Sequence, residues 1–190
     1  MLDAAWWHAV NLTGWPAWRK AETLEQMGAL VVRWLDGQDR FLPWHVGPPE
    51  SESAEIVEPL RTLNQHGLMT TNSQPGVALE KGIQRAWVSL LASPAAAQDL
   101  VTTSDSVGLI AMCEEMRPLP ATRVPITMTA NGRVTTATDG ASENLFLPGR
   151  AKVAASQAWS VTIIDPVWGE RRCSGMFRPS RRLGTESRGD

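Results

Sequence analysis

The sequence predicts an α/β domain, with α+β as the alternative: a single mixed sheet flanked by helices, with a β-hairpin near residues 123–138. Three observations support this class. Residues 24–35 carry apolar side chains at helical spacing. Residues 84–113 follow the order strand, helix, strand, which is typical of a right-handed βαβ unit. Residues 123–138 alternate polar and apolar around Asn131-Gly132, a dipeptide typical of the turn between two antiparallel strands.

The helix over residues 24–35 has sequence signals at both of its ends. Thr23 is a candidate N-cap, because its hydroxyl can accept a hydrogen bond from a backbone N–H of the first turn. Gln26 stands three residues later and completes a capping-box pattern. Gly37 ends the helical periodicity. We therefore expect an amphipathic helix that buries one face.

A second helix is expected to have Ser51 or Ser53 as its N-cap and to end at Gly67, followed by a short strand over residues 68–72. Glycine at the end of a helix adopts the left-handed conformation that other residues avoid, so Gly67 predicts the helix stop. Pro59 lies inside the helical pattern. Because proline lacks an N–H, we expect it to bend the helix or to confine regular helical bonding to the part after it.

Composition sets the broad class of protein. The chain has 190 residues, and its net charge of -2 predicts no nucleic-acid partner. No apolar run is long enough for a membrane helix, so we expect no membrane partner and a cytoplasmic location. We predict one α/β domain over residues 1–178, with a Trp-rich N-terminal extension (1–20) and a disordered tail (179–190).

Known catalytic and metal-binding patterns are absent from the sequence. The three histidines, His8, His45 and His66, are far apart and have no metal-ligand spacing. The two cysteines, Cys113 and Cys173, form no CxxC pair. No phosphate-binding glycine loop and no nucleophile motif occurs. We therefore expect no catalytic residues and no metal site.

A run of polar residues leaves the predicted strand and enters a turn: Thr70, Thr71, Asn72, Ser73 and Gln74 precede Pro75-Gly76. Strict alternation along a strand would place Thr70 and Asn72 on one side and Thr71 on the other. α/β proteins commonly bind ligands at strand ends. The alternative is local, because Asn and Ser side chains also bond the backbone of their own turn.

Residues 63–75, LNQHGLMTTNSQP, resemble the VNRQGILTINSQP segment of the C-terminal regulatory domain of eukaryotic methylenetetrahydrofolate reductases. That domain binds S-adenosylmethionine. The chain also resembles, over most of its length, a family of small actinobacterial proteins of unknown function. These share a Trp-containing first helix, a Pro-Pro or Pro-Asp loop and a T[TN]SQPG motif. This second likeness implies no activity.

The resemblance to the regulatory domain implies a set of ligand contacts. A Glu-Thr pair of that domain falls on Glu52-Ser53, and the Thr and Ser of its TINSQP motif fall on Thr70 and Ser73. A further threonine, in its TVVDP segment, falls on Thr162. One position departs from the pattern, since a threonine of the family falls on Glu143. The chain is also too short to hold the catalytic barrel of the reductase together with this domain.

We therefore expect an uncharacterised small-molecule-binding module rather than an enzyme, with S-adenosylmethionine or a related adenosyl or nucleotide ligand and no certain cofactor. The candidate ligand-binding residues are Glu52, Ser53, Thr70, Thr71, Asn72, Ser73, Gln74, Thr162 and Asp165.

Two alternatives stay open. The first is an enzyme that uses the same pocket, with Glu52 or Asp165 as general base. The second is a protein-interaction module that uses a patch formed by the Trp-rich N-terminus, Trp6, Trp7, Trp15 and Trp18. The identity of any protein partner is not predicted by the sequence.

Overall fold

The structure, a computed structural model, describes residues 15–80, 82–116, 123–138, 140 and 145–169, and the side chains of Glu52 and Leu79 lie outside this description. Helices and antiparallel sheets form a mixed α and β fold, which confirms the predicted class. Most of the expected N-terminal extension and all of the expected tail lie outside the described residues, so both stay predictions.

The helices follow the signals that precede and end them. Thr23 accepts a hydrogen bond from the N–H of Gln26 at 3.2 Å, as expected for an N-cap. The Gln26 side chain accepts a hydrogen bond from the N–H of Glu22 at 2.7 Å.

No helix among the described residues is long and apolar enough to cross a membrane. The helices are α2 (Pro16–Lys20), α3 (Leu24–Leu35), the 3-10 helix η1 (Ser51–Ile56), α4 (Val57–Gln65), α5 (Pro94–Ser106) and α6 (Arg150–Ser156).

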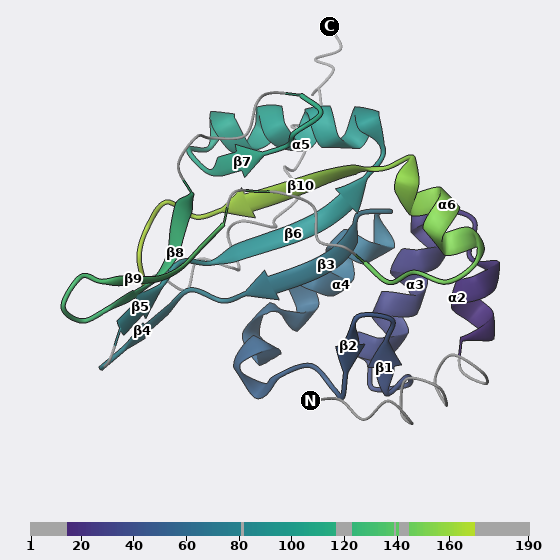
Figure 1. The fold of residues 1–190 in the computed structure, drawn as a ribbon, viewed down its shortest axis with the longest axis horizontal. Coiled ribbons are helices and arrows are strands. Elements are labelled where there is room, and N and C mark those ends of the chain that lie inside the picture. The colour runs from purple at the N-terminus through teal and green to yellow at the C-terminus, as the bar shows by residue number, and fades with distance from the viewer. Residues whose placement is uncertain (1–14, 81, 117–122, 139, 141–144, 170–190) are drawn as a thin grey trace, which may run out of the picture.

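Two four-stranded antiparallel sheets replace the single mixed sheet that the sequence predicts (Figure 1). The first has the order β3-β6-β10-β7, with β3 (Met69–Gln74), β6 (Trp87–Ala92), β10 (Trp159–Ile164) and β7 (Ile110–Met112). The second has the order β4-β5-β8-β9, with β4 (Val77–Leu79), β5 (Gly82–Gln84), β8 (Val124–Thr129) and β9 (Val134–Thr138). A short hairpin joins β1 (Phe41–Leu42) to β2 (His45–Val46).

The single-sheet prediction is wrong because two features of the sheets depend on pairing between distant segments, which the local sequence pattern does not show. β10 enters between β6 and β7, so these two strands run parallel without pairing, and both ladders are antiparallel. The first strand of the predicted strand, helix, strand order is also divided at Arg85–Ala86, with β5 in one sheet and β6 in the other. The predicted hairpin is confirmed, because β8 pairs with β9 around a turn that contains Gly132.

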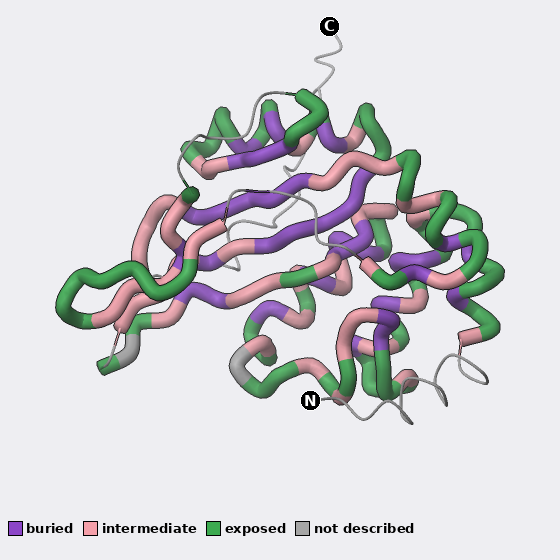
Figure 2. The backbone as a smooth tube through the Cα atoms, viewed as in Figure 1, coloured by how far each residue is buried: buried purple, intermediate pink, exposed green. Residues whose placement is uncertain are grey.

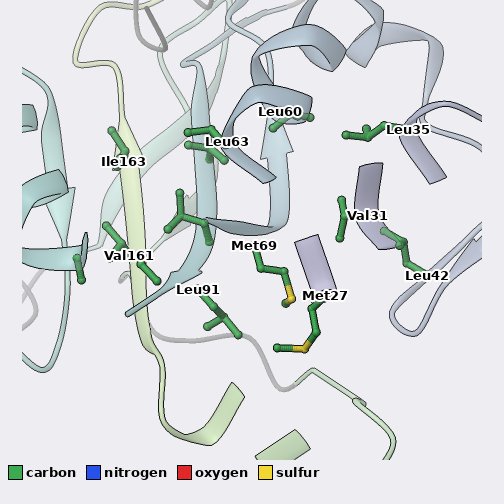
Figure 3. Close-up of a cluster of buried hydrophobic side chains, with 14 of the residues drawn as sticks. Met27, Val31, Leu35, Leu42, Leu60, Leu63, Met69, Leu91, Val161 and Ile163 are labelled. Carbon is green, nitrogen blue, oxygen red and sulfur yellow. The ribbon is translucent and has the colours of Figure 1, made fainter. Parts of the chain in front are cut away.

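The core lies between the first sheet and its helices. β6 and β10 are the most buried strands (Figure 2). α5 packs on β6, β7 and β10, and α4 packs on β3. Met27 of α3 and Met69 of β3 are completely buried and lie beside Leu91 (Figure 3). Burial of such side chains stabilises the fold by about 1.5–3 kcal/mol each.

Asn64 joins α4 to β3 through three hydrogen bonds. Its side-chain amide donates to the carbonyl of Leu60 at 2.8 Å and to Oγ1 of Thr70 at 2.7 Å. Its Oδ1 accepts from the N–H of Thr70 at 3.1 Å. Asn64 is 1% exposed, so water cannot replace these bonds. Between the two elements, Gly67 has a positive φ and the N–H of Leu68 bonds the carbonyl of Leu63, which confirms the expected helix stop.

Replacing Asn64 with alanine should lower the free energy of unfolding by about 1–3 kcal/mol, because the buried Thr70 N–H loses its acceptor. Chemical denaturation measures this change. The neighbouring Gln65 is exposed, so Gln65→Ala should change stability by less than about 0.5 kcal/mol. Equal stability of the two variants would contradict the role given to the Asn64 amide.

Gly28 of α3 marks a close approach of α3 to α4. A Cβ at this position would stand 2.6 Å from the carbonyl oxygen of Asn64, which is backbone. Gly28→Ala should therefore destabilise the protein by about 1–3 kcal/mol, although alanine favours helix more than glycine does. Thermal unfolding tests this. Ala29→Gly, on the exposed side of the same helix, measures the propensity effect alone, at about 1 kcal/mol. A higher melting temperature for Gly28→Ala would show that the helices are free to separate.

Candidate functional site

A β-bulge in β3 decides which of the candidate residues share a face. Thr70 pairs with Leu90 and Asn72 with the adjacent Ser89, so Thr71 is an extra residue in the ladder. Ser73 then pairs with Val88. Because Ser89 lies on the opposite face of β6 from Val88 and Leu90, Thr70 and Ser73 share one face.

The expectation that Thr70 and Asn72 face the same side is therefore wrong. One additional residue in a strand reverses the alternation after it. The sequence pattern of the polar run does not show where that residue is inserted.

The face of Thr70 and Ser73 is the face that α4 covers. Thr70 is 7% exposed and is held by Asn64. Ser73 is half-buried nearer to the end of the strand. α4 and β3 run in opposite directions, so η1 lies toward the end of β3 that carries Ser73 (Figure 1). Ser53 in η1 is half-buried and its N–H bonds the carbonyl of Glu50 at 2.9 Å. The side chain of Glu52 lies outside the described part.

Thr162 lies on the other face of the sheet. It pairs with Ser89 across the β10–β6 ladder, and the two hydroxyls are 2.7 Å apart in a hydrogen bond. Thr162 is only 1% exposed and Ser89 is 8% exposed. The structure thus brings Thr70 and Ser73 together and places Thr162 on the opposite side of β6. The buried hydroxyl pair satisfies polar groups that would otherwise be costly inside the sheet.

Gln74 and Asp165 lie on either side of β6 at one end of the first sheet, which we call the sheet junction (Gln74, Pro75, Arg85, Ala86 and Asp165). β3 and β10 both end there and β6 begins there. The side chain of Gln74 accepts a hydrogen bond from the indole N–H of Trp87 at 3.2 Å. The backbone N–H of Asp165 donates to the carbonyl of Ala86 at 2.9 Å. Candidate residues from two distant parts of the chain are therefore neighbours of the same strand.

Asp165 is 3% exposed, and one of its carboxylate oxygens has a structural role. Oδ1 accepts a hydrogen bond from the N–H of Val167 at 2.9 Å, which fixes the turn after β10. Aspartate commonly stabilises turns in this way. The second oxygen, Oδ2, has no hydrogen-bond donor among the described residues.

Arg85 is the charged residue of the sheet junction that the sequence patterns missed. Its Nη1 donates to the carbonyl of Pro125 at 3.1 Å, and its guanidinium carbon lies 4.3 Å from the centre of the Trp168 ring. Its Nε is buried and has no acceptor among the described residues. Burial lowers the pKa of Arg85, and the negative charge of Asp165 opposes this effect. The available signal was one arginine between the apolar residues Ile83 and Trp87.

Other chemistry-bearing groups of the described residues are engaged in the fold. The thiol of Cys113 is buried, and burial together with Glu115 raises its pKa, which disfavours the nucleophilic thiolate. No cluster of three or more metal-binding side chains occurs in the described ranges. Trp18 is 5% exposed in the core and Trp15 packs against it. These two do not form an exposed patch, and Trp6 and Trp7 lie outside the description.

Comparison with known proteins shows a similarity that covers part of the chain. The chain is similar to methylenetetrahydrofolate reductase 2 of Saccharomyces cerevisiae, with 37% identity over 60 residues. This similarity covers 32% of the chain and 10% of the yeast protein. The match therefore concerns a small part of the yeast enzyme.

A family model covers much more of the chain. Residues 15–174 match the model of a family described as a domain of unknown function, DUF6919. This range extends from α2 to beyond β10 and so includes both four-stranded sheets. The protein belongs to the DUF6919 family.

Proposed function

We propose that the protein binds a small molecule at the sheet junction and the adjoining end of β3, with S-adenosylmethionine or a related adenosyl ligand as the first candidate. One observation carries the proposal: Arg85, Asp165 and Gln74 gather at one end of the sheet, and hydrogen-bonding atoms of Arg85 and Asp165 have no partner in the described structure. Small-molecule sites commonly combine a few polar groups with aromatic walls. In this proposal such walls are Trp87, which bonds Gln74, and Trp168, which lies over the guanidinium of Arg85.

The choice of ligand follows from the resemblance of LNQHGLMTTNSQP to the regulatory domain that binds S-adenosylmethionine. The partial similarity to a methylenetetrahydrofolate reductase supports the same choice. In this proposal, the amide of Gln74 contacts the ligand, since it can both donate and accept hydrogen bonds. Ser73 lies on the opposite face of the same edge strand, so a ligand reaches both residues by wrapping around the end of β3. Ser53 is a further candidate contact, because η1 lies toward the end of β3 that carries Ser73.

We assign Thr70 and Thr162 a supporting part. Each hydroxyl is buried and bonds another side chain, Asn64 for Thr70 and Ser89 for Thr162. Their hydrogen bonds fix β3, β6 and β10 relative to one another. The strand ends that carry Gln74 and Asp165 are held in place by this interior bonding, which gives a preformed site.

Calorimetric titration tests the proposed ligand. We expect S-adenosylmethionine or S-adenosylhomocysteine to bind the wild-type protein and Gln74→Ala to weaken binding by about tenfold, through the loss of one polar contact. Gln98 is exposed on α5, so Gln98→Ala is the matched control and should bind as wild type does.

Absence of both heat and thermal stabilisation at millimolar ligand would reject the adenosyl proposal. Equal affinities of the Gln74→Ala and Gln98→Ala variants would place the ligand away from the sheet junction. Circular dichroism of each variant confirms that it has folded before its affinity is compared.

A further inference from the structure

We propose that the sheet junction binds the α-amino-acid head group of its ligand, with the carboxylate on Arg85 and the ammonium group beside Asp165. This inference deepens the proposed function, because it names the part of the ligand that the site recognises. Its basis is that Arg85 and Asp165 carry opposite charges, lie at the same junction and keep unused hydrogen-bonding atoms.

The guanidinium of Arg85 uses few of its donors. A guanidinium carries five N–H groups. In the described structure only Nη1 has an acceptor, the carbonyl of Pro125. Nε is buried and has no partner there. Nη2 does not share this state, since it is not one of the buried atoms without a partner. The edge formed by Nε and Nη2 matches the two oxygens of a carboxylate.

The position of this edge is fixed by the residues that hold the guanidinium. The bond to Pro125 anchors one end of the group, and the ring of Trp168 lies over its face. Stacking on Trp168 and the bond to Pro125 already restrict the side chain, so Arg85 loses less rotational freedom when it binds an oxyanion. Trp168 is only half-buried, so in this proposal the ligand carboxylate reaches Nε at the edge of this ring.

Asp165 supplies the opposite charge. It acts on Arg85 electrostatically, yet the two side chains form no ion pair in the described structure. Opposite charges in a low-dielectric site attract strongly, and they normally close to contact unless their positions are fixed. Oδ1 of Asp165 is fixed by the N–H of Val167, and Nη1 of Arg85 is fixed by Pro125.

The separated pair selects for a zwitterion. An isolated carboxylate on Arg85 would be repelled by Asp165, and an isolated amine beside Asp165 would be repelled by Arg85. A ligand that carries both charges on adjacent atoms satisfies Oδ2 of Asp165 and the fork of Arg85 together. The methionyl end of S-adenosylmethionine has this chemistry, and so do free amino acids.

Three probes of equal length isolate the two charges: L-methionine, 4-(methylthio)butanoate, which lacks the ammonium group, and 3-(methylthio)propylamine, which lacks the carboxylate. Binding is followed by NMR through the indole N–H signals of Trp87 and Trp168. We expect saturable shifts with L-methionine. The two truncated probes should bind at least about tenfold more weakly, since each leaves one buried charge without its partner.

Variants test the two residues separately. Arg85→Gln should abolish the L-methionine shifts, and Arg85→Lys should keep weak binding, since it retains the charge without the fork. Asp165→Asn keeps Oδ1 for the Val167 turn. It should weaken L-methionine about tenfold and strengthen 4-(methylthio)butanoate, because it removes the repulsion. Arg133→Gln, on the exposed hairpin, is the control and should change nothing.

The outcomes separate this inference from the proposed ligand. Saturable L-methionine binding that requires Arg85 supports the head-group site, even when S-adenosylmethionine does not bind. Binding of S-adenosylmethionine that is unchanged in Arg85→Gln, or equal affinities for the three probes, overturns the head-group site while a ligand elsewhere remains. No saturable shift with L-methionine also overturns it.

Discussion

The ladder between β3 and β6 ends at Pro75, whose ring nitrogen has no hydrogen to donate. Opposite this point the other strand changes partners: the N–H of Arg85 bonds Ile126 of β8, and the carbonyl of Ala86 accepts from Asp165 at the end of β10. The segment that forms β3 and β4 therefore pairs with the segment that forms β5 and β6 in both sheets. β10 is the third strand of the first sheet, and β8 is the third strand of the second. The gathering of charged and polar groups at the sheet junction follows from this exchange.

Polar side chains serve two different purposes along the first sheet. Inside it, the amide of Asn64 and the hydroxyl pair of Ser89 and Thr162 are fully engaged with neighbouring strands or helices. At the sheet junction, Arg85 and Asp165 keep unused hydrogen-bonding atoms. Interior bonding joins the strands to one another, whereas the groups at the sheet junction are only partly satisfied, which is why the proposed site is placed there. Such a division is expected of a site held by a preformed scaffold.

Local signals in the sequence were sufficient for the helix ends and the hairpin. Thr23, Gly67 and Asn131-Gly132 act through bonds to residues a few positions away, and the structure has each feature where the signals predict it. The bulge at Thr71 and the entry of β10 between β6 and β7 depend on pairing between distant segments, so no local pattern reports them. The polar run in the sequence identifies several candidate residues but does not indicate their division between two faces. No local pattern marks Arg85, because its contacts are with the distant residues Pro125 and Trp168.

The order of the strands in the first sheet has a consequence for the synthesis of the protein. β10 is the last described strand in the sequence, yet it lies between β6 and β7 and is bonded to both. Until residue 164 has left the ribosome, these two strands have no common partner strand, and the edges that β10 joins stay unpaired. The sheet contacts are therefore formed late and over long separations, which slows folding and prolongs the exposure of unpaired edges. The nascent chain depends on its C-terminal part before it can be a compact molecule.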